Sequence, residues 1–163
     1  MKGTLIRLAV VALLAALAAC AHAISERARA MVDPAVSAKE LFARPEAFRG
    51  RVVMLGGFIV GVRLTEDRTH IEVVQKPLDR TGRPREDDVT EGRFIVVTEG
   101  YLDPAIYSPG RELTVAGEVL GRELRPLGDA QYPYVLVRAI EMRLFKAYEP
   151  LPVRFGIGVI TTF

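Results

Sequence analysis

The stretch RVVMLGGFIVGVRL, residues 51–64, decides the fold class of this chain. It is rich in β-branched residues and alternates between two faces, so it predicts a β-strand. Two adjacent glycines, Gly56 and Gly57, stand in its middle. Paired glycines inside a strand usually mark a bulge or a sharp bend, as the corner of a small barrel requires. We therefore expect the chain to bend at this pair.

Four further segments have the same character: residues 70–75, 93–99, 112–121 and 132–145. A polar loop and a connection with a helical turn separate them. Upstream, Ser37 and Glu40 have the capping-box spacing that predicts a short helix. Five strands and one helix, with no regular alternation of the two, predict a mainly β domain. The best match is a small antiparallel barrel of five to six strands, similar to an OB-fold, with one short N-terminal helix. A β-sandwich is the alternative, although its seven strands are hard to find.

The first nineteen residues have the pattern of an export signal. Lys2 and Arg7 precede twelve uninterrupted apolar residues, 8–19. That run suits the apolar core of a secretory signal and is shorter than the roughly 20 residues of a membrane-spanning helix. It ends in Leu17, Ala18, Ala19 and Cys20, a sequence similar to the bacterial lipobox. In a lipobox, small residues fit the lipoprotein signal peptidase, and the lipid is attached to the thiol of the cysteine. A buried helix and a chance cysteine behind an ordinary cleavage site are the alternatives.

The predicted organisation has four parts. These are a lipoprotein signal peptide (1–19), a lipidated tether (20–34), a β-barrel domain (35–146) and a C-terminal tail (147–163) that contains a short strand. Cleavage removes Lys2 and Arg7 and leaves twenty basic and twenty acidic residues. A chain with no net charge lacks the excess of Lys and Arg that attracts the phosphates of nucleic acid, so we expect no nucleic-acid partner. A membrane-spanning barrel needs about eight strands or more, which this chain lacks.

Several mid-chain motifs resemble one known family. They are GGFIVGVR (56–63), THIEVVQKPLDRTGRP (69–84), EGRFIVV (91–97), GYLDPAIYSPGRELTVAGEVLG (100–121) and YPYVLV (132–137). Together with the lipobox they are similar to the Slp, or starvation-lipoprotein, family of bacterial outer-membrane lipoproteins. The resemblance implies a Gram-negative outer-membrane protein that faces the periplasm and contacts membrane lipid through acylated Cys20. It implies no reaction and no cofactor. The motif residues with suspected structural roles are Gly56, Gly57, Pro77, Leu78, Gly92, Arg93, Phe94, Asp103, Pro104, Tyr107, Gly110 and Arg111.

Some of these motif residues have roles that elementary chemistry suggests. Pro77 should end the second strand because it lacks a backbone donor. Gly92 should allow the backbone to turn from the polar loop into the third strand. Asp103 and the proline after it should cap a helical turn. Arg93 or Arg111 could pair with a buried carboxylate.

Catalytic and metal-binding patterns are weak. The only cysteine is lipidated on this interpretation, which excludes a disulfide scaffold and a multi-cysteine metal site. His70 and Glu72 share a strand face, but a triad would also need a nucleophile. The acidic run 86–88 lacks EF-hand spacing and is interleaved with arginines, so we expect no metal site.

We therefore expect a non-enzymatic binding or scaffolding lipoprotein of the envelope, linked to stress or starvation, with an envelope protein as a further partner. A carrier for a lipid or cell-wall fragment is the alternative, and an enzyme is the third hypothesis. A large apolar cavity would favour the carrier. A filled core would favour the scaffold, and a pocket uniting His70, Glu72 and an orienting group would favour the enzyme.

Overall fold

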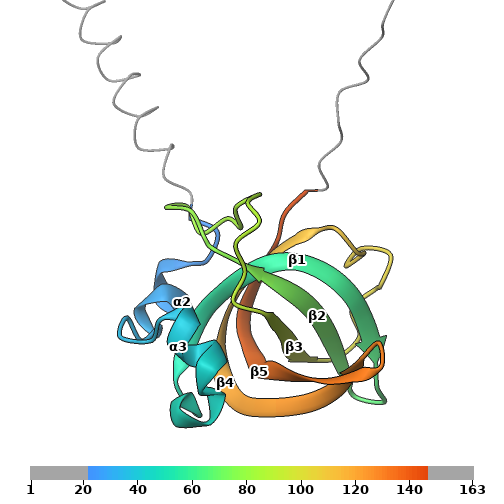
Figure 1. Ribbon diagram of the computed structural model, residues 1–163. Coiled ribbons are helices and arrows are strands. Elements are labelled where there is room, and N and C mark those ends of the chain that lie inside the picture. Colours follow the sequence, from blue (N-terminus) through green and yellow to red (C-terminus); the bar gives the residue numbers. More distant parts are fainter. Residues whose placement is uncertain (1–21, 147–163) are drawn as a thin grey trace, which may run out of the picture.

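Five long, curved strands close into a barrel in the computed structural model, which describes residues 22–146 (Figure 1). The strand order around the barrel is β1, β2, β3, β5, β4 and back to β1. The mainly β, OB-like barrel predicted from the sequence is therefore confirmed. The strands are β1 (Val52–Leu64), β2 (Arg68–Lys76), β3 (Arg93–Glu99), β4 (Glu112–Leu127) and β5 (Ala130–Leu144).

One strand pair departs from the predicted antiparallel arrangement. β3 and β5 run parallel, with Phe94 opposite Val135, whereas the other four neighbouring pairs are antiparallel. β2 is antiparallel to both β1 and β3, and β4 is antiparallel to β1, so β4 runs opposite to β3. After the β4–β5 hairpin, β5 therefore has the same direction as β3. The parallel pair is the seam that closes the barrel.

Apolar side chains fill the barrel interior. Alternation along the strands sends one face inward, so each strand contributes to a single cluster. A 13-residue buried cluster comprises Leu41, Val53, Leu55, Ile59, Ile71, Val73, Phe94, Val96, Leu113, Val115, Val119, Val135 and Val137. A packed interior of this kind stabilises the domain.

The glycine pair of β1 does not form the expected bulge. Gly56 and Gly57 are both in regular register with β2 and with β4, and the irregularity falls between Ile59 and Gly61. The pair instead permits close approach of the neighbouring strands. A Cβ atom on Gly57 would lie 1.8 Å from the backbone oxygen of Val74. The register excludes a bulge at this pair, whereas the bend expected there stays a prediction.

The predicted N-terminal helix is present. α3 (Ala38–Ala43) begins after Ser37, whose hydroxyl oxygen accepts a hydrogen bond from the Glu40 backbone N–H at 3.2 Å. Leu41 from this helix is buried in the core, and the ring of Phe42 meets Phe94 edge to face at 6.5 Å. A short 3-10 turn, η1 (Pro45–Phe48), leads into β1.

The tether predicted for residues 20–34 is wrong over the part that the structure describes. A second helix, α2 (Glu26–Ala30), packs against the outside of the barrel (Figure 1). Ile24 and Ala28 lie four positions apart and are 1% and 4% exposed, in a cluster with Ala116. Ile24 lies just before the N-cap residue Ser25 and Ala28 lies within the helix, and both side chains are buried against the barrel, so the segment docks instead of extending into solvent.

Several predictions fall outside residues 22–146. These are the signal peptide with Leu17, Ala18, Ala19 and Cys20, and the tail strand within residues 147–163. Over the described range, every helix is too short to span a bilayer.

Candidate functional site

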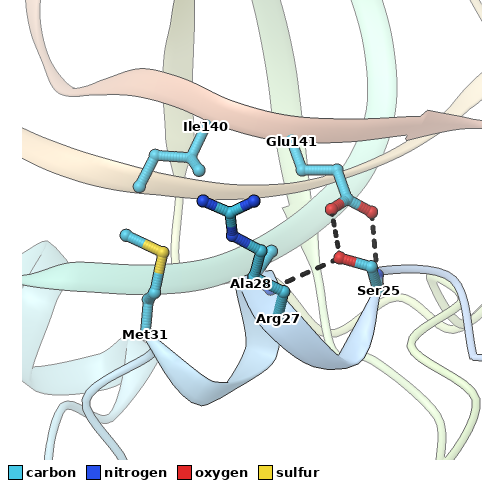
Figure 2. A pocket seen from close by; sticks show the side chains of 6 residues that line it. All are labelled: Ser25, Arg27, Ala28, Met31, Ile140 and Glu141. Atoms are coloured by element: carbon cyan, nitrogen blue, oxygen red, sulfur yellow. Dashed lines mark hydrogen bonds between the residues drawn. The ribbon is translucent and has the colours of Figure 1, made fainter.

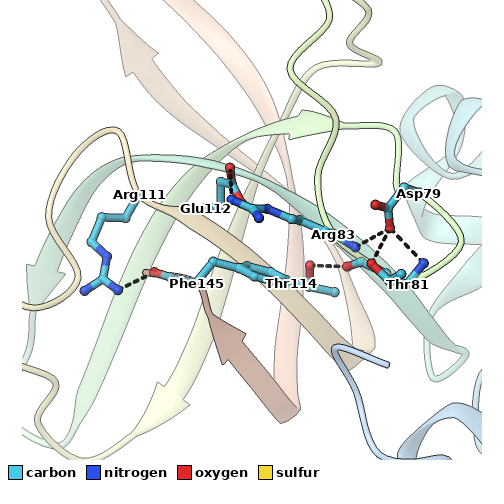
Figure 3. Close-up of polar contacts among 8 residues, drawn as sticks. Asp79, Thr81, Arg83, Arg111, Glu112, Thr114 and Phe145 are labelled. Carbon is cyan, nitrogen blue, oxygen red and sulfur yellow. Dashed lines mark hydrogen bonds and ion pairs between the residues drawn. The ribbon is translucent and has the colours of Figure 1, made fainter. Parts of the chain in front are cut away.

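The family motif KPLD…GRP forms an ordered turn in the loop of residues 77–92, which we name the motif loop. The Asp79 carboxylate accepts hydrogen bonds from the Thr81 backbone N–H at 2.8 Å, the Thr81 hydroxyl at 2.7 Å and the Arg83 backbone N–H at 2.9 Å (Figure 3). These bonds, the Thr81 hydroxyl first, lower the pKa of Asp79. One carboxylate thus holds two residues of the loop, Thr81 and Arg83, in place through three hydrogen bonds.

Two contacts fasten this turn to the first residues of β4. The Arg83 guanidinium pairs with the carboxylate of Glu112 at 2.5 and 3.1 Å, and Glu112 is only 6% exposed (Figure 3). The buried Thr114 hydroxyl donates to the Gly82 carbonyl at 2.7 Å. A two-pronged arginine–carboxylate pair fixes orientation as well as distance. The motif loop is therefore a rigid cover over one end of the barrel.

The two ends of the described chain lie beside the motif loop. The Ala23 backbone N–H donates to the Thr81 carbonyl at 2.7 Å. At the other terminus, the Arg83 guanidinium lies 5.3 Å from the centroid of the Phe145 ring. Figure 1 shows both described ends leaving the barrel on the side of this loop. We name this region, formed by residues 22–24, 77–92 and 145–146, the anchor end.

The remaining motif residues of β2 and β3 have structural positions. β2 ends directly before Pro77, as predicted. Leu78 reaches back to β1, where a Cβ atom on Gly56 would lie 2.5 Å from its Cδ2 atom. Gly92 precedes β3 with a φ of 136°, a conformation that favours glycine. Phe94 is fully buried in the core.

The motif of residues 103–111 forms a turn that leads into β4. The Asp103 carboxylate accepts from the Ala105 backbone N–H at 2.9 Å, and the Asp103 carbonyl accepts from that of Tyr107 at 3.0 Å. The prediction that Asp103 and Pro104 cap a turn is confirmed. The Gly110 backbone N–H then donates to β1 at 2.8 Å.

The two motif arginines have different partners. Arg93 pairs with Glu72 at 2.7 Å, so the predicted carboxylate partner is present, although it is half-buried and not buried as expected. Arg111 was a candidate for a carboxylate, but its guanidinium instead donates to the carbonyls of Ile106, at 2.7 Å, and Phe145. It therefore joins the turn before β4 to the residue that follows β5, and within residues 22–146 it forms no ion pair.

His70 and Glu72 share a hollow of about 330 Å³, between the outer face of β1 and β2 and the β4–β5 hairpin. We name it the hairpin hollow. Its lining residues are Gly61, Val62, Arg63, His70, Glu72, Arg125 and Pro126.

Both candidate catalytic side chains of this hollow already have partners. Arg125 Nη2 lies 2.8 Å from His70 Nδ1. The Glu72 carboxylate accepts from Arg93 and, at 2.9 Å, from the Tyr134 hydroxyl. Burial, then the charge of Arg125, lowers the pKa of His70. The hollow unites the predicted pair, but its lining contains no serine, threonine or cysteine. Side chains that are already hydrogen-bonded in this way suit binding better than proton transfer.

A second hollow, of about 380 Å³, lies between α2 and β5 (Figure 2). The Glu141 carboxylate accepts from the Ser25 backbone N–H at 2.8 Å and from its hydroxyl at 2.5 Å. These bonds lower the pKa of Glu141. Arg27, Met31 and Ile140 complete the edges. Polar and apolar side chains both line this hollow, so we interpret it as the gap between the docked helix α2 and the barrel.

The acidic run 86–88 forms ion pairs and backbone contacts. Asp87 pairs with Arg85 at 3.1 Å, and its carbonyl accepts from Lys76 at 2.5 Å. Across residues 22–146, His, Cys, Asp and Glu form no group with the arrangement of a metal site.

Comparison with known proteins gives the family. The family model described as "Outer membrane lipoprotein Slp family" matches residues 17–156. The chain belongs to the Slp family. It is similar over 94 residues, at 28% identity, to an uncharacterized lipoprotein, YeaY, of Escherichia coli K12, covering 58% of this chain and 48% of that protein. It is 32% identical over 96 residues to an uncharacterized protein of Haemophilus influenzae, covering 58% and 52%.

The matches to these relatives span about half of their length. Among solved structures, the Slp-family chain is similar to a small single-stranded DNA-binding protein from Streptomyces coelicolor. That likeness has a TM-score of 0.38 at 14% identity, over 59% of this chain and 94% of the other. Membership establishes a lipoprotein of the outer membrane.

Proposed function

We propose that this Slp-family lipoprotein is a non-enzymatic binding or scaffolding component of the cell envelope that serves under stress or starvation. Its barrel faces the periplasm and is held against the outer membrane by lipid on Cys20. The anchor end carries this proposal, because the start of the domain, the motif loop and the end of β5 all meet there.

The distance from lipid to domain is short. Cys20 precedes His22 by two positions in the sequence, and an extended chain advances at most about 3.6 Å per residue. The lipidated sulfur therefore lies within about 1.5 nm of the Ala23–Thr81 contact, allowing for side-chain reach. A lipid fixed there holds the anchor end against the membrane and turns the β4–β5 hairpin towards the periplasm.

Two observations support a scaffold over the alternatives. The barrel interior is packed with apolar side chains, so a carrier would have to hold its cargo on the outside. The His70–Glu72 pair has partners that orient it, but nothing in its hollow lining supplies a hydroxyl or thiol nucleophile. Rigid attachment at one end leaves the opposite end free for a protein or polymer partner.

Membrane fractionation of a Cys20→Ser variant tests the anchoring. We expect the variant to move from the outer-membrane fraction to the soluble fraction and to lose incorporation of labelled fatty acid. A Ser25→Ala variant, which keeps the cysteine, is the matched control and should stay in the membrane. Membrane retention of Cys20→Ser without label would contradict the proposal.

Photo-crosslinking in cells tests the orientation. A photoreactive residue in place of Arg80, which is exposed in the motif loop, should capture phospholipid. The same residue in place of Asp129, exposed at the β4–β5 turn, should capture protein or polymer and no phospholipid. Equal lipid capture at both positions would show that the barrel tumbles freely and would refute the fixed orientation.

A further inference from the structure

The hairpin hollow brings together three nitrogen donors from three strands. Arg63 comes from β1, His70 from β2 and Arg125 from the hairpin arm of β4. All three line the same hollow of about 330 Å³, a size that suits a small ligand. Nothing in the proposed anchoring uses these residues, so the hollow needs an explanation of its own.

Contacts at its wall fix the state of His70. A guanidinium has donors and no acceptor, so the 2.8 Å contact requires His70 Nδ1 to accept from Arg125. The ring is then neutral, and its proton lies on Nε2 as a further donor. Burial and the neighbouring arginine charges lower the pKa of His70, in agreement with this state. Arg125 is also paired with Glu123, and its side chain is only 16% exposed. Two of the three donors are therefore already in place.

The charge balance of the lining favours an anion. Glu72, the acidic lining residue, already accepts from Arg93 and from Tyr134. Arg63 is exposed, and within residues 22–146 no ion pair within 4.0 Å is recorded for it. Unused guanidinium donors are well suited to carboxylate or phosphate oxygens.

The rest of the lining indicates what the anion is attached to. Val62 and Pro126 provide apolar surface beside the donors, which suits the C–H face of a sugar ring. The lining contains no phenylalanine, tyrosine or tryptophan for a base to stack on, and its one aromatic ring, the His70 imidazole, is already bonded to Arg125, which disfavours a nucleotide. We propose that the hairpin hollow binds an acidic saccharide, whose carboxylate or phosphate contacts Arg63 and Arg125 while its ring packs on Val62 and Pro126.

The position of the hollow agrees with such a ligand. Its residues lie at the far ends of β1, β2 and β4, away from the anchor end. In the anchored protein this part of the barrel would face the glycan-containing space of the envelope. The binding chemistry itself does not depend on the lipid, so loss of anchoring leaves this inference intact.

Three probes with one ring test the proposal on the detergent-solubilised full chain. Glucose 6-phosphate, glucuronic acid and neutral glucose share a hexose and differ in charge. Binding is measured by NMR chemical-shift titration. We expect one or both acidic sugars to bind at least about tenfold more tightly than glucose, and more weakly as salt rises. The tighter of the two identifies phosphate or carboxylate as the natural group.

Two variants make the test specific. Arg63→Gln should weaken binding of the acidic sugar about tenfold, because it removes a charged donor. Arg44→Gln has the same charge change at an exposed position next to α3, and should leave the affinity unchanged. Arg63 is also exposed, so both variants should keep the wild-type circular dichroism spectrum.

Three results would overturn the inference. One is no binding of either acidic sugar at millimolar concentration. Another is equal affinity for glucose and the acidic sugars, or for inorganic phosphate and glucose 6-phosphate, since the ring would then contribute nothing. The third is an equal loss of affinity in Arg63→Gln and Arg44→Gln, which would indicate general charge attraction without a site.

Discussion

Replacement of Gly57 by alanine should damage the barrel severely, and the same replacement at Gly61 should not. A Cβ atom at Gly57 would lie 1.8 Å from the Val74 oxygen and 2.9 Å from a methyl carbon of Val73. The first of these atoms is backbone, so relief requires β1 and β2 to separate. At Gly61, by contrast, no atom lies within 4 Å of the new methyl group.

The cost can be estimated from these contacts. Overpacking a well-filled interior costs about 1–3 kcal/mol, and a clash with backbone belongs at or above the upper end. We expect Gly57→Ala to lower the free energy of unfolding by about 3 kcal/mol or more. Gly61→Ala should change it by less than about 1 kcal/mol, and the sign could be stabilising because the unfolded chain loses freedom. Gly56→Ala should lie between them, because Leu78 can move.

Urea unfolding followed by far-UV circular dichroism measures the difference, because the chain has no tryptophan. With a slope of about 2 kcal/mol per molar urea, 3 kcal/mol shifts the midpoint by about 1.5 M. The Cys20→Ser full-length chain provides a lipid-free background for all variants. Equal midpoints for Gly57→Ala and Gly61→Ala would refute the close-approach argument.

Further predictions concern ion pairs and pH. Glu112→Gln should destabilise the protein by about 1–3 kcal/mol, because it removes the charge that pairs with Arg83. This cost is below that of a fully buried pair, because the Arg83 side chain is 45% exposed and solvent screens its charge. Glu118→Gln removes an exposed pair with Arg138 and should cost less than about 1 kcal/mol; equal thermal shifts in the two variants would contradict this ranking. The pKa of His70 lies below its usual 6.5 in the folded protein, so the unfolded state binds its proton first, and stability should begin to fall as pH drops below about 6.5. His70→Gln should remove that first decline in a series of melts at different pH. A steeper loss of stability should follow below about pH 4.5, because folding lowers the pKa of the carboxyl groups of Glu46, Asp79, Glu123 and Glu141. A flat stability profile down to pH 3 would contradict this expectation.

Local sequence rules predicted the parts of the fold that depend on neighbouring residues. β3 has the bounds expected for residues 93–99, and the helix after Ser37 begins with its predicted cap. Pro77 follows the end of β2, and Asp103 caps its turn. Each of these depends on contacts within a few positions, which is why the residue type alone carried the information.

The misses have identifiable causes. β4 extends to residue 127, beyond the predicted end at residue 121, and β5 begins at residue 130, before the predicted start at residue 132. Pro126 is a strand breaker by type, but it is tolerated in this arm of the hairpin. The parallel pairing of β3 with β5 is a long-range contact that no local pattern encodes. The docked segment did leave a signal, since Ile24 and Ala28 have helical spacing and Ser25 is a capping residue.

The candidate site was predicted in part. The sequence singled out the motif loop residues and the shared face of His70 and Glu72. It did not bring Arg63 and Arg125 to them, because 62 positions separate these arginines in the chain. Only closure of the barrel places the hairpin arm over β2.

The lipidation that we propose for Cys20 would set an order of events during maturation. An enzyme that acylates the cysteine must enclose it, yet the described folded chain begins at His22, only two positions further along the sequence. The barrel in turn cannot close until β5 has left the export channel, since that strand forms the seam with β3. Lipid attachment is therefore expected on a chain that is still unfolded, with closure following at the membrane surface. Long-range pairings make such closure slow, on the order of milliseconds to seconds, which leaves time for the modification to come first.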